Sequence, residues 1–146
     1  MIILDTNVVS EVMKPAPSPV VVEWLNAADT ASLYLTSITI AEIRYGLDVL
    51  PTGKRKQALE QAFAAVVREG FAGRLLGFDD VAAAEYGKLM AEARRLGHPM
   101  GILDGQIAAI ARAGGFDLAT RNLRDFKYCG VALLAPFDAS GRGGEG

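Results

Sequence analysis

The stretch Met1-Ile2-Ile3-Leu4-Asp5-Thr6-Asn7 decides the fold that we expect for this chain. Four apolar residues in a row predict a short buried strand, and the polar residues after them predict a turn into a helix. Asp5 then stands at the C-terminal tip of a buried strand, where ligands bind in parallel α/β sheets. Asp5 or Thr6 would also cap a helix that begins at Asn7 or Val8. This stretch alone leaves both roles open.

The composition fits one globular domain. The chain has 146 residues, of which 51% are hydrophobic and 22% are charged, with a formal net charge of −2. That charge argues against a protein that coats nucleic acid non-specifically, although it permits local recognition. Cys129 is the only cysteine, which indicates a reducing compartment. Because we also find no signal-peptide features and no long apolar run, we expect a cytoplasmic protein without membrane contact.

Short apolar strands alternate with helices along the chain. After the first strand, further strands are expected at 33–36, 74–78, 118–120 and 131–134. Helices are expected at 7–13, from Ser18, at 37–50, 54–70, 79–97 and 104–113. This alternation predicts a three-layer α/β/α domain with a mostly parallel, five-stranded sheet. The domain should span residues 1–137, and the remainder, 138–146, is predicted to be a disordered tail.

Four acidic residues lie where predicted strands end or predicted helices begin: Asp5, Glu42, Asp104 and Asp125. Asp5 ends the first strand, and Asp125 lies just beyond the fourth. Glu42 lies near the start of the helix after the second strand, whereas Asp104 starts an otherwise apolar helix. In a parallel sheet the loops that carry Asp5, Glu42 and Asp125 open on one edge, so these carboxylates should converge.

Each of the later acids also has a purely structural interpretation. Thr39-Ile40-Ala41-Glu42 matches a capping box, in which Glu42 bonds back to the helix start. Asp104 suits the first turn of a helix because of the helix dipole, and Asp125 is able to cap a short turn. These interpretations do not explain why all the acids fall at such positions.

A set of carboxylates within a few ångströms has a specific physical consequence. The charges repel one another and raise each other's pKa, and a divalent cation removes that penalty. Oxygen ligands without His or Cys favour Mg²⁺ or Mn²⁺ over Zn²⁺. Such an ion lowers the pKa of its water and orients it for in-line attack on phosphorus. The pattern therefore predicts a phosphodiester hydrolase that needs no protein nucleophile.

Four segments together resemble the PIN domain, with the closest likeness to VapC/FitB-type toxins of bacterial toxin–antitoxin pairs. They are Met1 to Val8, Ala41-Glu42-Ile43-Arg44-Tyr45-Gly46, Asp104 to Ala109, and Thr120-Arg121-Asn122-Leu123-Arg124-Asp125-Phe126. The resemblance covers about residues 1–137. It implies a Mg²⁺- or Mn²⁺-dependent ribonuclease that forms a homodimer. It also implies inhibition by a small VapB/FitA-like antitoxin whose C-terminal segment enters the active-site groove, with DNA contacted only through that antitoxin.

The resemblance also implies roles for individual acids. Asp5, Glu42 and Asp104 match the metal-binding acids of the family. Some relatives carry the fourth acid where this chain has Asn122, and others where it has Asp125. We place the fourth acidic role on Asp125, with Asn122 as a neutral second ligand or water-holder. This departure from the family pattern leaves open whether one or two metal ions act.

Threonines and arginines near the acids complete the expected site. Thr6 and Thr120 are expected to support the acids and the attacking water through hydrogen bonds. Arg44, Arg121 and Arg124 lie close in sequence to the acids and are expected to steady the phosphates of the substrate. Their alternative role is that of ordinary solvated charges.

Two other functions compete with the ribonuclease. The first is a PIN-like module that binds RNA or a protein without cutting, which a metal titration would distinguish. The second is a phosphatase with an aspartyl-phosphate, which we disfavour because Asp5-Thr6-Asn7 lacks a second acid two residues after Asp5. For the homodimer, we expect contacts from Val20 to Leu25 and the neighbouring short helix.

Overall fold

The computed structural model describes residues 1–139, so most of the predicted tail lies outside the described residues. Within this range five strands form one sheet: β1 (Ile2–Leu4), β2 (Leu33–Thr36), β3 (Leu75–Leu76), β4 (Asp117–Ala119) and β5 (Leu133–Leu134). The strand order is β3-β2-β1-β4-β5, and each neighbouring pair is parallel. The predicted parallel α/β sheet is therefore confirmed.

Helices link the strands near the predicted positions. They are α1 (Thr6–Val12), α2 (Pro19–Ala27), α3 (Ser37–Asp48), α4 (Lys54–Ala65), α5 (Asp80–Arg95) and α6 (Ile102–Gly114). A short 3₁₀ turn, η1 (Thr30–Ser32), precedes β2, and the predicted end of α4 is instead a π-helical turn, η2 (Val66–Gly70). Over residues 1–139, none of the helices has the combined length and apolarity of a membrane-spanning segment.

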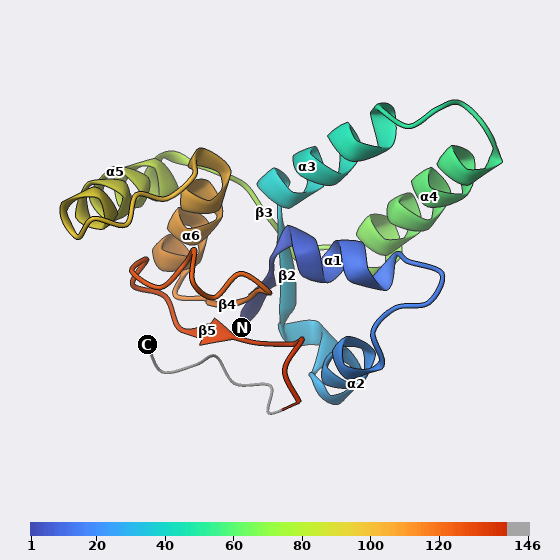
Figure 1. Ribbon diagram of the computed structural model, residues 1–146, viewed down its shortest axis with the longest axis horizontal. Helices are drawn as coiled ribbons and strands as arrows, with labels where there is room; N and C mark the ends of the chain where they lie inside the picture. Colours follow the sequence, from blue (N-terminus) through green and yellow to red (C-terminus); the bar gives the residue numbers. More distant parts are fainter. Residues whose placement is uncertain (140–146) are drawn as a thin grey trace.

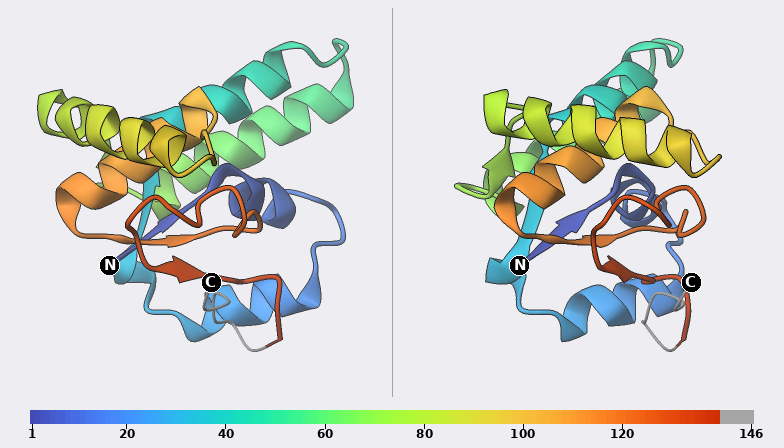
Figure 2. Two further views of the ribbon diagram at one scale, coloured as in Figure 1. Left: turned by 60° about the vertical axis from the view of Figure 1, so that its left-hand side comes forward. Right: turned by 90° about the vertical axis from the view of Figure 1, so that its left-hand side faces the viewer.

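Helices cover both faces of the sheet, as Figures 1 and 2 show. α5 and α6 pack on one face around Ile3 and Leu89, whereas α1 to α4 pack on the other around Leu4 and Val21. Ile3 and Leu4 point to opposite faces because side chains alternate along a strand. A strand that is buried on both sides needs apolar residues at successive positions, which is why the chain begins as it does.

Capping residues mark where the helices begin. Asp79 caps α5 as its sequence position suggests, with Oδ1 accepting from the backbone N–H of Ala82 at 2.9 Å. Thr36 caps α3, and its Oγ1 accepts from the backbone N–H of Thr39 at 3.2 Å. The capping-box interpretation of Glu42 is therefore wrong, because the helix starts one turn earlier than that box requires. The side chain of Glu42 is free for another contact.

The centre of the sheet is a topological switch point. From β1 the chain continues to β2 and β3 on one side and later returns to β4 and β5 on the other. In such sheets the crevice beyond the carboxyl ends of the central strands is the usual place for a ligand. Asp5 directly follows β1 and Thr120 directly follows β4. The backbone N–H of Asp5 donates to the carbonyl of Ala119 at 2.9 Å, which fixes these two strand ends side by side.

The apolar residues of α2 serve the core of this chain. Val21 is fully buried, and Trp24 and Leu25 are half-buried against the same cluster. The large apolar side chains that face solvent most lie on other helices, with Tyr45 of α3 72% exposed and Ile102 of α6 65% exposed. A homodimer through α2 stays a prediction, and these two helices offer more free apolar surface.

Candidate active site

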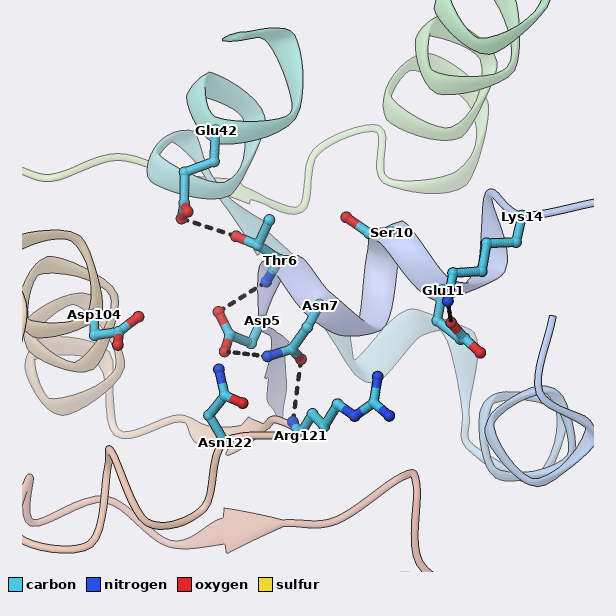
Figure 3. A pocket seen from close by; sticks show the side chains of 10 residues that line it. All are labelled: Asp5, Thr6, Asn7, Ser10, Glu11, Lys14, Glu42, Asp104, Arg121 and Asn122. Atoms are coloured by element: carbon cyan, nitrogen blue, oxygen red, sulfur yellow. Dashed lines mark hydrogen bonds and ion pairs between the residues drawn. The ribbon is translucent and has the colours of Figure 1, made fainter. Parts of the chain in front are cut away.

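An open pocket of about 380 Å³ lies at the C-terminal end of β1 (Figure 3). Segments that are far apart in the sequence meet there, from α1, α3, α6 and the loop after β4. The lining residues are Asp5, Thr6, Asn7, Ser10, Glu11, Lys14, Glu42, Asp104, Arg121 and Asn122. The fold thus brings three of the four predicted acids to one space, and Asp125 lies outside the lining.

Asp5 is the most firmly held of these acids. It is 3% exposed, and its Oδ1 accepts from the backbone N–H of Thr6 at 2.8 Å. Its Oδ2 accepts from the hydroxyl of Thr120 at 2.7 Å and from the side-chain amide of Asn7 at 3.2 Å. Asp5 is also the N-cap of α1. The capping role is confirmed, and it does not remove the carboxylate from the pocket.

Opposing effects act on the charge of Asp5. Burial raises the pKa of Asp5 above its ordinary value, and the negative charge of Asp125 raises it further. The hydrogen bonds from Thr120, Thr6 and Asn7 act in the opposite direction, but burial prevails. No positively charged group of the described residues is among the causes of this shift, so none offsets the cost of burying ionised Asp5.

Glu42 reaches the pocket from α3. Its Oε1 accepts a hydrogen bond from the hydroxyl of Thr6 at 2.9 Å, and that hydroxyl lies 3.0 Å from the hydroxyl oxygen of Thr39. Burial raises the pKa of Glu42, the Thr6 hydrogen bond lowers it, and the charge of Asp5 raises it. Thr6 therefore connects two acids, because its backbone N–H holds Asp5 while its hydroxyl holds Glu42.

Asp104 lies in the first turn of α6 and faces Asp5 across the pocket (Figure 3). Within residues 1–139 its carboxylate accepts no hydrogen bond from the protein. Burial, assisted by the charges of nearby acids, raises the pKa of Asp104 to about 6. In decreasing order of effect, these acids are Asp5, Asp125 and Glu42. Asp104 is thus the acid in the pocket whose negative charge the surrounding protein opposes most.

A glycine beside Asp104 allows α6 to approach α5. A Cβ atom at Gly105 would lie 2.5 Å from Sδ of Met90 and 3.0 Å from the ring of Tyr86. These distances are shorter than normal contacts, so a larger residue would have to displace the side chain of Met90 and the ring of Tyr86. Gly105 therefore lets these side chains of α5 pack against α6 directly beside Asp104.

The donor set suits a hard divalent cation. The acids contribute only oxygen atoms, and the lining holds no His or Cys. Across the described residues, no three acidic, His or Cys side chains lie close enough together to form a ready metal cluster. Carboxylates that face one another without a cation between them repel, so we expect these side chains to lie apart. Oxygen ligands and uncompensated negative charge together fit Mg²⁺ or Mn²⁺.

The two candidates for the fourth acidic role occupy different places. Asn122 lines the pocket, and its backbone N–H donates to the hydroxyl of Thr120 at 3.0 Å. Asp125 is exposed and outside the lining, although its charge raises the pKa of Asp5 and of Asp104. Asp125 therefore acts on the acids from a distance, and Asn122 is the residue at the pocket wall.

The three predicted arginines are separated in space. Arg121 lines the pocket, and its backbone N–H donates to Oδ1 of Asn7 at 3.1 Å. The guanidinium of Arg44 lies 5.6 Å from the centre of the Phe63 ring on α4. Neither Arg44 nor the exposed Arg124 belongs to the lining.

Four lining residues were missed by the sequence reasoning: Asn7, Ser10, Glu11 and Lys14. Their spacing is i, i+3, i+4 and i+7, so they follow one face of α1 and the turn after it. The intervening positions include Val8, Val9 and Val12, which pack inward. This polar stripe on an otherwise apolar short helix is the signal that would have found them.

Comparison with known proteins identifies the family. A family model described as the PIN domain matches residues 2–130. The chain belongs to the PIN domain family. "VapC ribonuclease Y4jK" of Sinorhizobium fredii is 42% identical over 138 residues, which cover 94% of this chain and 99% of the relative. "Toxin FitB" of Neisseria gonorrhoeae is 39% identical over 137 residues, with coverage of 94% and 99%.

A solved structure of a similar protein supports the same family. FitAB bound to the IR36 DNA fragment matches this PIN domain with a TM-score of 0.90 at 38% identity, covering 94% of this chain and 96% of the other. The predicted resemblance to VapC/FitB-type toxins and the predicted α/β PIN-like fold are both confirmed.

Proposed function

We propose that this PIN domain is a Mg²⁺- or Mn²⁺-dependent endoribonuclease toxin that hydrolyses RNA phosphodiester bonds in the cytoplasm. The observation that carries the proposal is the shared pocket of Asp5, Glu42 and Asp104 at the switch point of the sheet. Its relatives are named ribonucleases and toxins, which supports the same activity here.

In this proposal Asp5, Glu42 and Asp104 hold the cation. When bound, Mg²⁺ or Mn²⁺ would supply a Lewis acid that lets water attack phosphorus at neutral pH. The chain itself orients the carboxylates. Thr6 holds Asp5 and Glu42 through its two donors, and the Thr120 hydroxyl fixes the second oxygen of Asp5.

Thr120 has a further part in keeping Asp5 ionised. Its hydrogen bond to Oδ2 of Asp5 lowers the pKa of that acid against the effect of burial. Asn122 supports this arrangement because its backbone N–H donates to the oxygen of the same hydroxyl. The hydroxyl proton then remains for the hydrogen bond to Asp5. These contacts support the proposed roles of Thr120 and Asn122.

An antitoxin and a second copy of the chain are the proposed partners. An apolar groove of about 650 Å³ adjoins the acidic pocket and shares four lining residues with it: Thr6, Ser10, Lys14 and Glu42. It offers a surface for the C-terminal segment of a VapB/FitA-like antitoxin, and we expect DNA contact only through that antitoxin. The likeness to FitAB bound to DNA supports this arrangement. The exposed Tyr45 and Ile102 are available for the homodimer.

The test is RNA cleavage by the purified protein. Cleavage should require Mg²⁺ or Mn²⁺, should stop with EDTA, and should be abolished by Asp5→Asn or Asp104→Asn with the fold retained. Asp48→Asn, at the exposed end of α3, is the matched control and should cleave normally. Cleavage that survives the loss of Asp5 or Asp104 would count against the mechanism.

A PIN-like module that binds RNA or protein without cutting is the second candidate. The observation that favours it is that no three acids among residues 1–139 form a ready metal cluster. For such a module, RNA binding would be independent of Mg²⁺ and Mn²⁺, and no cleavage would appear at any metal concentration. The cleavage assay with added metal therefore separates the two candidates.

A further inference from the structure

The pocket has a cationic end that the proposed metal site does not use. Lys14 and Arg121 line that end, whereas Asp5, Glu42 and Asp104 line the other (Figure 3). From Asp5 to Glu11 the chain advances about 9 Å along the axis of α1. Asp5 and Glu11 are therefore separated by more than one turn of α1.

A buried carboxylate organises the cationic end. Glu11 is 8% exposed, its Oε2 lies 2.6 Å from Nζ of Lys14, and its Oε1 accepts from the backbone N–H of Ser18 at 3.1 Å. The hydrogen bond from Lys14 lowers the pKa of Glu11 despite burial, with help from Ser18 and Arg121. The side chain of Lys14 itself is 57% exposed. Glu11 thus holds the ammonium group of Lys14 in place while leaving it open to a ligand.

Arg121 is held from two other sides. Its backbone N–H donates to Oδ1 of Asn7 at 3.1 Å, and its guanidinium carbon lies 4.7 Å from the centre of the Phe137 ring. Figure 3 shows its side chain extending along the pocket towards Glu11. Over residues 1–139 the guanidinium donates no hydrogen bond to the protein, so its five N–H groups are available to a ligand.

A purely structural role explains part of this arrangement. A lysine just after the C-terminal end of α1 suits the helix dipole, and Glu11 ties down the turn that leads to Ser18. That role does not require a second cation from the other end of the sequence. It also does not explain why Arg121 is fixed on Phe137 with its donors left free. Two positioned cations beside a pocket for a phosphodiester indicate a second phosphate.

We propose that Lys14 and Arg121 bind a phosphate that flanks the scissile one in single-stranded RNA, and that Glu11 is the positioning residue for Lys14. This inference rests on the proposed ribonuclease function. The RNA strand lies along α1, with the scissile phosphate at the acidic end and the flanking phosphate at the cationic end. A substrate must therefore extend past the scissile bond on the side of α1.

The first test is the kinetics of Lys14→Gln and Arg121→Gln on an oligoribonucleotide that the wild-type protein cleaves. Each variant should raise KM about tenfold and keep kcat within about twofold, because a phosphate away from the reacting atoms contributes uniform binding. The slope of log KM against log salt concentration should become shallower by about 0.7 for each lost contact to a single strand. Lys14→Arg should restore most of the binding, and Glu11→Gln should raise KM less than Lys14→Gln.

Lys88→Gln is the matched control, because Lys88 forms an exposed ion pair with Glu85 on α5 and lies outside the pocket. If Lys14→Gln and Arg121→Gln match Lys88→Gln in KM and salt slope while the wild-type protein cleaves, the inference is overturned. A wild-type protein that fails to cleave with Mg²⁺ or Mn²⁺ instead refutes the proposed function. In that case the phosphate contact is tested by RNA binding in EDTA. The salt dependence of Kd should be shallower for Lys14→Gln and Arg121→Gln than for the wild-type protein.

The second test locates the contact on the RNA. Methylphosphonate linkages, which carry no charge, replace the phosphates of the oligonucleotide one at a time. The wild-type protein should lose affinity at one flanking linkage, and Lys14→Gln combined with Arg121→Gln should lose nothing further there. Equal losses in both proteins at each linkage would contradict the assignment.

Discussion

Asp5 and Asp104 face the same pocket, yet the protein holds them in different ways. Asp5 accepts three hydrogen bonds and caps α1, so it is part of the fold. Asp104 accepts none from the protein within residues 1–139, and its pKa is raised to about 6. The fold therefore depends on the carboxylate of Asp5 and does not depend on the carboxylate of Asp104. Loss of either should stop the chemistry, and their effects on stability should differ.

Truncation to alanine should show this difference at its largest. Asp5→Ala leaves the donors of Thr6 and Thr120 without a partner and removes a helix cap, which should cost about 2 kcal/mol of unfolding free energy. Asp104→Ala removes an unfavourable charge and should cost much less. Urea denaturation in EDTA measures both. Equal destabilisation by the two changes would contradict the contrast, and both variants should lack ribonuclease activity.

The pH dependence of stability should sharpen the comparison. The folded state raises the pKa of Asp104 to about 6 from an ordinary value of 3.8, so the folded protein holds this proton more tightly than the unfolded chain. The contribution of Asp104 to stability therefore falls as pH rises from about 4 to about 6, and stays low above that. Asp104→Asn should be more stable than wild type at pH 7, by about 1 kcal/mol after allowance for solvent screening.

Denaturation curves in EDTA at pH 4 and pH 7 check this prediction. The advantage of Asp104→Asn should shrink strongly at the lower pH, where folded wild-type protein is neutral at this position and the unfolded chain is only partly ionised there. A variant that is less stable than wild type at pH 7 would show that the carboxylate of Asp104 has a stabilising partner in solution.

The support of Asp5 by Thr120 should have a smaller effect. Thr120→Val keeps the shape of the buried side chain but removes the hydrogen bond to Oδ2 of Asp5. Cleavage should fall about tenfold, as for other residues that orient metal ligands, with a loss of about 1 to 2 kcal/mol in stability. Thr120→Ser keeps the hydroxyl and should retain most of the activity. A normal rate for Thr120→Val would remove the supporting role.

The sequence predicted the order and type of the elements because each carries a local signal. The apolar run of β1 is an example that needed no tertiary information. The start of α3 at Ser37 was predicted, but its cap was not, since Thr36, Ser37 and Thr39 are all able to cap a helix and only the backbone shows that Thr36 does so. The capping-box interpretation of Glu42 was wrong for that reason.

The site was predictable to the extent that it follows from topology. Strand ends in a parallel sheet bring Asp5 and Thr120 together, and the family pattern adds Glu42 and Asp104. The loop after β4 has no such rule, because its path decides whether Asn122 or Asp125 lines the pocket. Side-chain direction also separated Arg121, which lines the pocket, from Arg44, which lies against Phe63, although both are close to an acid in sequence.

The smallest expected effect concerns Asp125. Its charge raises the pKa of Asp5 and Asp104 from outside the lining. Asp125→Asn should therefore change the rate of RNA cleavage only a few-fold, because it alters the field at the acids and does not remove a ligand. Single-turnover cleavage compares it with Asp104→Asn. If the two variants are equally inactive, Asp125 is a fourth catalytic acid and the loop after β4 closes on the substrate.

The central claim is that Asp5, Glu42 and Asp104 share one divalent cation, and Mn²⁺-dependent thermal stability tests it most directly. A ligand that binds only the folded state raises the melting temperature by an amount that grows with the logarithm of its concentration above its Kd. Mn²⁺ should raise the melting temperature of the wild-type protein and of Asp48→Asn, and should have little effect on Asp5→Asn, Glu42→Gln or Asp104→Asn. An equal shift in all five proteins, or none in the wild type, would contradict the account.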